Sequence, residues 1–119
     1  MAWSSFHNIS SKLERALTGD FDEMLWKLDQ AILNGSMSAT LEDSSDFTIG
    51  SVRAAVRMYE RYSALGGNRV ALSLTLAGEG DRLHLTAITA GGSQAMFFKV
   101  NTWGEEAFLD TLADAVDRL

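Results

Sequence analysis

The chain of 119 residues contains no cysteine, no proline and only two histidines. Without cysteine it has no disulfide framework, thiolate zinc site or thiol nucleophile. The lack of proline suits long paired strands, because proline removes a hydrogen-bond donor from a strand. No apolar run approaches the ~20 residues of a membrane helix, and the Met1 end lacks the basic start and long apolar stretch of a signal peptide. We therefore expect a cytoplasmic protein without a membrane segment.

Positive charge is also scarce, since ten Lys and Arg stand against sixteen Asp and Glu for a net charge of −6. This balance argues against a general nucleic-acid binder, which needs clustered positive charge. The charges are segregated along the chain. Residues 1–50 hold three basic and eight acidic side chains, residues 51–101 hold six and three, and residues 102–119 hold one and five. The pattern predicts a basic sheet between acidic helices, a complementarity that favours solubility.

Alternation of apolar and polar side chains is abundant, and it runs from Ser51 to Asn101. A period of two over this length predicts an antiparallel sheet with one buried face. In the strand over Ser51–Tyr62, four residues are expected to face the core: Val52, Ala54, Val56 and Met58. The opposite, outward face would then carry Arg53, Ala55, Arg57, Tyr59 and Arg61. Later strands are expected to turn inward Val70, Leu72, Leu74 and Leu76, then Leu83, Leu85 and Ala87, and finally Met96, Phe98 and Val100.

A helix is predicted after Gly19, because Asp20 and Glu23 have the spacing of a capping box. Its apolar stripe consists of Phe21, Met24, Leu25, Leu28 and Ile32. The pair Asn34-Gly35 is expected to end this helix. Alternation over Ser11–Leu17 predicts a first strand, with a short helix as the alternative. After the helix, Ser36–Leu41 is predicted as a strand and Glu42–Asp46 as a polar turn.

A second capping box, Thr102 with Glu105, predicts a C-terminal helix. Its inward stripe would consist of Phe108, Leu109, Leu112, Val116 and Leu119. The sequence therefore predicts an α+β two-layer sandwich: an antiparallel sheet of about five strands with two helices packed on one face. The order is strand, helix, four strands, helix. Residues 1–10 are expected to form a loosely held arm, and residues 11–119 a single domain.

Five stretches of the chain resemble a family of short bacterial proteins known only as a domain of unknown function. They are Gly19–Glu23, Leu41–Asp46, Val56–Tyr62, Ala90–Ala95 and Gly104–Leu109. The resemblance covers nearly everything from Ser11 onward. It implies a compact bacterial cytoplasmic domain, and it carries no activity, cofactor or functional residue with it.

The first candidate site is the row of arginines on the outward face of the 51–62 strand. Arginine guanidinium groups bind carboxylate and phosphate in a bidentate manner, so such a face could hold a small anion. The candidate anion-binding residues are Arg53, Arg57, Tyr59, Arg61, His84 and Lys99. The alternative is that this face is solvated or faces another subunit, with its arginines paired to acidic side chains.

Other motifs favour ordinary structure over chemistry. The acidic segment Glu42–Asp46 lacks the glycine and final glutamate of a calcium loop, so no metal site is predicted. Gly91-Gly92-Ser93-Gln94 lacks the lysine and helix of a phosphate-binding loop. No spacing brings His7 or His84 together with a nucleophile and an acid, as a triad requires. The sequence therefore predicts a protein without a cofactor, and leans against an enzyme.

Two hypotheses for function remain. The first is a non-enzymatic homodimer, because Trp26 and Leu33 form a second apolar patch on the predicted helix and aromatics and arginine are enriched at interface centres. The candidate interface residues are Trp26, Leu33, Arg57 and Tyr59. The alternative is a small-molecule or anion-binding domain with a pocket between sheet and helices. Neither a nucleic acid nor a membrane is expected as a partner.

Overall fold

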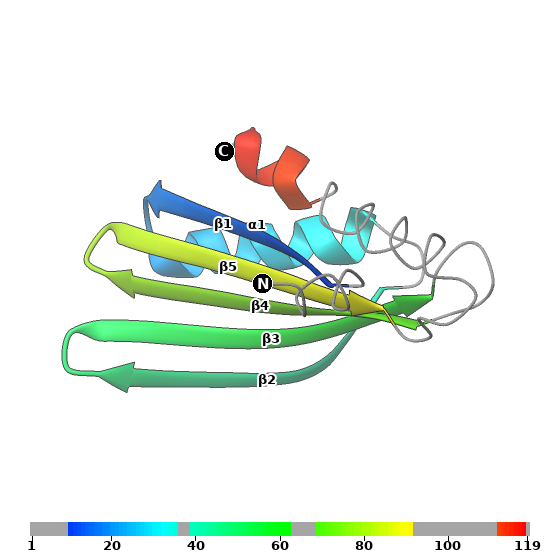
Figure 1. Cartoon of the computed structure of the whole chain (residues 1–119). Helices are drawn as coiled ribbons and strands as arrows, with labels where there is room; N and C mark the ends of the chain where they lie inside the picture. Colours follow the sequence, from blue (N-terminus) through cyan, green and yellow to red (C-terminus); the bar gives the residue numbers. More distant parts are fainter. Residues whose placement is uncertain (1–9, 36–38, 63–68, 92–111, 119) are drawn as a thin grey trace, which may run out of the picture.

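Five antiparallel strands form one sheet in the computed structural model, which describes residues 10–35, 39–62, 69–91 and 112–118. The strands are β1 (Ser10–Thr18), β2 (Thr40–Ile49), β3 (Val52–Tyr62), β4 (Arg69–Glu79) and β5 (Arg82–Gly91), and their order across the sheet is β1-β5-β4-β3-β2 (Figure 1). Helix α1 (Phe21–Gly35) joins β1 to β2, and residues 112–117 form a second helix. The predicted α+β class and the order of its elements are confirmed.

Helix α1 begins and ends where the sequence predicts. The backbone N–H of Glu23 donates a hydrogen bond of 2.9 Å to Oδ2 of Asp20, which satisfies one of the free donors of the first turn. The helix ends at Gly35, and its buried side chains belong to the predicted stripe: Phe21, Met24, Leu28 and Ile32. Within the described ranges, no helix has the length and apolar character needed to cross a bilayer.

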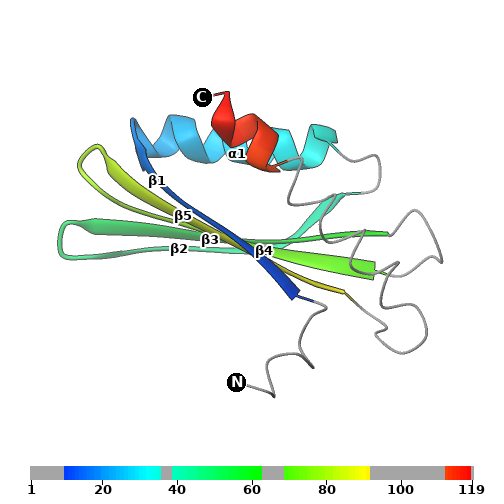
Figure 2. The same ribbon diagram turned by 45° about the horizontal axis from the view of Figure 1, so that its top comes forward.

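Both helices lie on the same side of the sheet (Figure 2). The 112–117 helix is next to β1, since Asp117 is 3.9 Å from Nε of Arg15, and it buries Leu112 and Val116 against the core. We call the helix-covered side the inner face. The other side, which no described helix covers, is the open face.

The core lies between the inner face and the helices. Strands β1, β4 and β5 direct toward the core the side chains that the alternation predicts. Six of these are completely buried: Val70, Leu72, Leu74, Leu76, Leu85 and Ala87. Burying a leucine side chain contributes about 1.5–3 kcal/mol, so this row accounts for much of the stability of the layer.

The segment Glu42–Asp46 is not a turn, as the sequence analysis predicts, but the middle of β2. The turn comes later, at Gly50-Ser51, where Gly50 adopts a φ of 60° as a two-residue hairpin requires. A polar sequence is tolerated here because β2 is an edge strand, and all ten of its residues are exposed. Charged side chains on an edge also discourage pairing with other sheets.

Several predicted features lie outside the described residues. These are most of the N-terminal arm, most of the turn Gly91-Gly92-Ser93, the strand over 96–100, the capping box at Thr102, Lys99 and the start of the Ser36–Leu41 strand.

Candidate functional site

Strand β3 presents the opposite face to the core from the one predicted. Ala55 and Tyr59 are completely buried, whereas Val52 and Met58 are 40% and 38% exposed. The register agrees, because Tyr59 is the direct cross-strand partner of the buried Leu72. The prediction that Val52, Ala54, Val56 and Met58 line the core is therefore wrong, and Arg53, Ala55, Arg57, Tyr59 and Arg61 lie on the inner face.

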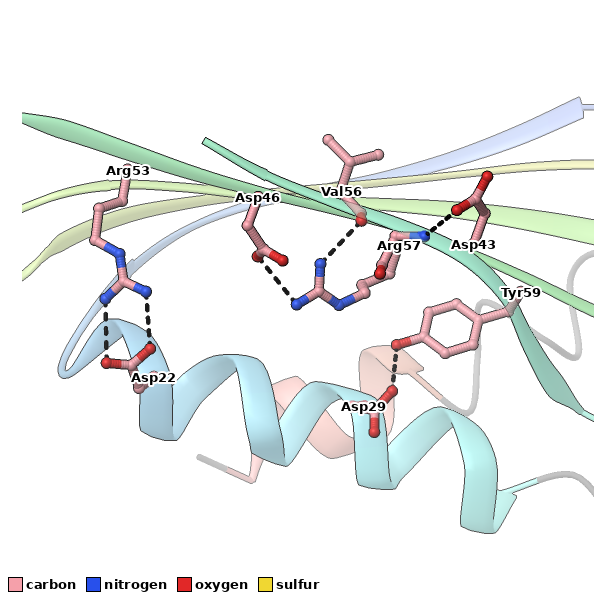
Figure 3. Close-up of polar contacts among 9 residues, drawn as sticks. Asp22, Asp29, Asp43, Asp46, Arg53, Val56, Arg57 and Tyr59 are labelled. Carbon is pink, nitrogen blue, oxygen red and sulfur yellow. Dashed lines mark hydrogen bonds and ion pairs between the residues drawn. The ribbon is translucent and has the colours of Figure 1, made fainter. Parts of the chain in front are cut away.

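Strand β3 turns its arginines and Tyr59 toward the helices because the acidic flank of α1 lies over this strand. Arg53 donates two hydrogen bonds to Asp22, of 2.9 and 3.1 Å, and the Tyr59 hydroxyl donates one of 2.6 Å to Asp29 (Figure 3). The Arg53 guanidinium lowers the pKa of Asp22, and Asp22 in turn raises the pKa of Arg53. The Arg53 guanidinium also lies over the ring of Phe21, 4.2 Å from the ring centroid. These contacts align α1 with the sheet.

The candidate anion-binding residues do not converge on one site. Arg57 lies on the inner face with 15% of its side chain exposed, and it donates to Oδ1 of Asp46 at 3.1 Å and to the carbonyl of Val56. Arg61 is half-buried on the same face, and burial lowers its pKa. His84 lies on the open face, so it cannot join this row. The pairing of Arg53 and Arg57 with carboxylates favours a structural role for this row.

The candidate interface residues gather on the helix side of the sheet. Trp26 is four residues after Asp22, and Leu33 four after Asp29, so all four occupy the flank of α1 that overlies β3. Trp26 is 63% exposed there, and Leu33 packs partly against the core. Tyr59 is completely buried beneath this flank, so its side chain holds the subunit together.

A large exposed apolar surface lies on the open face and was not predicted. Phe47 and Ile49 of β2 are 49% and 73% exposed, and they are the direct partners of Ala54 and Val52 on β3. The surface consists of Phe47, Ile49, Val52, Val56 and Met58, and we call it the apolar patch. The sequence pattern that could have indicated this patch is the alternation of Ser45, Phe47 and Ile49 on one face of a strand, which ends at Gly50.

Polar side chains on the β1 and β5 side of the open face form a small cluster. Oε2 of Glu14 is 3.1 Å from Nε2 of His84 and accepts a 3.4 Å hydrogen bond from Thr86. Lys12 forms an ion pair of 3.4 Å with the same carboxylate. Hydrogen bonding to His84, with a smaller effect of Lys12, lowers the pKa of Glu14.

In the part of the chain that the structure describes, no group of His, Asp and Glu could hold a metal ion. The acids of β2 illustrate why. Asp43 pairs with Met58 and lies on the open face, whereas Asp46 pairs with Ala55 and lies on the inner face (Figure 3). Their carboxylates therefore point to opposite sides of the sheet.

Comparison with known proteins identifies the family. The sequence matches the family model DUF6054 over residues 10–119. The chain belongs to this family of unknown function. None of the curated proteins matches the chain.

Two solved structures are similar to the chain. One is the protein of unknown function PA94 from Pseudomonas aeruginosa, with a TM-score of 0.52 and 16% identity, covering 82% of this chain and 68% of that one. The other is the Ran-binding protein Mog1p from Saccharomyces cerevisiae, with a TM-score of 0.47 and 12% identity, covering 91% of this chain and 63% of that one. At this identity the likeness to PA94 shows a shared fold alone.

Proposed function

We propose that this member of the DUF6054 family is a non-enzymatic domain that forms a homodimer through the open face of its sheet. The observation that carries the proposal is the apolar patch. Monomeric proteins rarely expose a contiguous surface of large apolar side chains unless it binds something. Here the patch extends over two adjacent strands and has no described helix above it.

Charge favours a second copy of the same chain as the occupant. Two molecules of net charge −6 repel each other, so a shared surface must be one on which charges balance. On the open face, Lys12 is paired with Glu14 and Arg69 with Glu60, and the apolar patch itself carries no charge. Helix α1 carries three carboxylates, Asp22, Glu23 and Asp29, against one basic side chain, Lys27, and Arg53 of β3 pairs with Asp22.

Pairing through the exposed edge of β2 is less favourable. Strand β2 carries three carboxylates, Glu42, Asp43 and Asp46, and no basic side chain, so pairing two β2 edges would bring like charges together. Like charges directly opposite each other destabilise a strand pair. The face of the sheet is therefore preferred to this edge.

The hydrogen bonds of the open face support a non-enzymatic role. The group that accepts from the Thr86 hydroxyl is the Glu14 carboxylate, at 3.4 Å, and the hydrogen bond to His84 lowers the pKa of Glu14. A lowered pKa makes this carboxylate a weak base, and a hydroxyl nucleophile needs a strong one to be activated.

The change Phe47→Asp tests the proposal. We expect the wild-type protein to be a dimer and the variant to dissociate at least tenfold more readily, because a buried aromatic anchor would be replaced by a charge. Light scattering and native mass spectrometry across a dilution series measure this.

Trp26→Asp is the matched control, since it adds the same charge at an exposed aromatic residue on the other side of the sheet. It should leave the dimer intact. A wild-type protein that is monomeric at all concentrations would reject self-association, and a dimer lost only in Trp26→Asp would place the interface on α1.

A further inference from the structure

The open face divides into two halves that differ in side-chain size. On β2 and β3 it presents the large residues of the apolar patch. On β4, β5 and β1 most of its side chains are short, and they include Ala71, Ser73, Thr75, Ala77, Thr86 and Ala16. Neither half is complementary to a copy of itself, because two large halves would bring large residues against large residues and two short halves would leave a gap.

A hollow lies mainly on the short half and reaches Val52 of the apolar patch. It measures about 480 Å³, and its lining includes Ala16, Ala77 and His84. The register places these three residues and Ala54 in one row across the sheet, and this row ends on β2 at Phe47. The hollow and the most prominent aromatic residue of the apolar patch therefore lie at the same level along the strands.

We infer that the dimer packs the two sheets face to face about a two-fold axis that runs parallel to the strands above β4; this inference rests on the proposed function. Such an axis exchanges the β1 edge of the sheet with the β2 edge. It leaves each row of paired residues at the same position along the strand direction. It places β2 of one subunit over β1 of its partner, and β3 over β5. Phe47 then enters the hollow of the partner, and the large half of each subunit covers the short half of the other. Two twisted sheets pack in this aligned manner in β-sandwiches.

The extent of the open face suits a stable dimer. With strands about 4.8 Å apart and a rise of about 3.3 Å per residue, the face covers on the order of 600 Å² in projection. This is comparable with the roughly 800 Å² of accessible surface per partner in standard interfaces. The two-fold axis makes the interface isologous, so the assembly closes as a dimer.

The arrangement also brings opposite charges together. Lys12 on β1 and Asp43 on β2 are the two ends of one row, which runs through Ile88, Ser73 and Met58. Across the axis, Lys12 of one subunit lies over Asp43 of the partner subunit, and the symmetry repeats the pair. Ile88, which is 44% exposed, lies over Met58 of the partner subunit. The first of these two contacts joins groups that attract, and in the second both side chains lose contact with water.

Charge reversal of this pair tests the arrangement. We expect Lys12→Glu and Asp43→Lys each to raise the dimer dissociation constant about three- to tenfold, and the double variant to return within about twofold of wild type. Asp43→Lys makes the net charge of each subunit less negative. A long-range effect of net charge would therefore tighten the dimer, so a weaker dimer reports the local contact.

Glu23→Lys is the matched control, because it changes the net charge equally at an exposed carboxylate but lies on α1, on the other side of the sheet. It should neither weaken the dimer like Asp43→Lys nor restore it when combined with Lys12→Glu. Circular dichroism and melting curves confirm that each variant is folded before its mass is measured.

The outcomes separate the two proposals. A wild-type monomer overturns both. Phe47→Asp could dissociate the dimer while the double variant of Lys12 and Asp43 stays as weak as the single variants. That result would keep the open face as the interface and overturn the two-fold arrangement. Rescue by Asp43→Lys, with none by Glu23→Lys, supports the arrangement.

Discussion

Adding a single methyl group at Gly78 is expected to destabilise the protein by about 1–3 kcal/mol. A Cβ atom at this position would lie 2.6 Å from Cδ2 of Leu83 and 2.9 Å from Cδ2 of Phe21. Both side chains are buried, so neither can move away without disturbing the first turn of α1 or the start of β5. Thermal unfolding of Gly78→Ala should show a midpoint about 5–15 °C below that of the wild type.

A second substitution distinguishes this clash from a general effect on the strand. Leu83→Val removes the Cδ2 atom that the new methyl group would meet most closely. The double variant should therefore lose less stability than the sum of the two single variants, because the two sites are in contact. If Gly78→Ala were as stable as the wild type, the close packing of Phe21 over Gly78 would be wrong.

Tyr59→Phe is expected to cost about 1–3 kcal/mol, because it leaves the carboxylate of Asp29 without the hydroxyl that donates to it in a half-buried position. Tyr59 is among the largest completely buried side chains, and its ring is retained in the variant, so the change isolates the hydrogen bond. Urea unfolding at neutral pH measures the difference.

The cost of Tyr59→Phe should also depend on pH. Burial, and then the hydrogen bond to Asp29, raise the pKa of Tyr59 above its ordinary value of 10.0. The folded state thus retains the proton, and the stabilisation by Tyr59 is complete below pH 10. As the pH rises further, Tyr59 loses its proton in the unfolded chain only, which lowers the free energy of unfolding of the wild type. The difference between wild type and Tyr59→Phe should therefore shrink by about 1.4 kcal/mol per pH unit above 10.

Tyr62→Phe is the appropriate comparison, since Tyr62 is on the same strand but 56% exposed. Its effect on stability should be small. A Tyr59→Phe variant whose stability fell in parallel with the wild type between pH 9 and 11 would contradict the buried hydrogen bond to Asp29.

The boundaries of α1 and the inward faces of β1, β4 and β5 follow from local patterns. Asp20 caps α1 through a contact that spans three residues, and the leucines of β4 occupy one face under any arrangement that buries them. Such features depend on neighbours in the chain, which the sequence displays directly. The prediction of Glu42–Asp46 as a turn was wrong because polarity at an exposed edge strand resembles polarity in a loop.

The face of β3 depended on distant residues. Both of its faces contain apolar side chains, and the valines and methionine appear more suited to a core than arginine and tyrosine. Only the position of α1 decides between them, because Asp22 and Asp29 lie 31 and 30 residues before the Arg53 and Tyr59 that they bind. The sequence by itself determined the order of the elements and the layer that holds the core. The tertiary structure decided that Arg53 and Tyr59 lie beneath α1 and that the apolar patch faces outward, because the carboxylates that bind these two side chains belong to an element about thirty residues earlier in the chain.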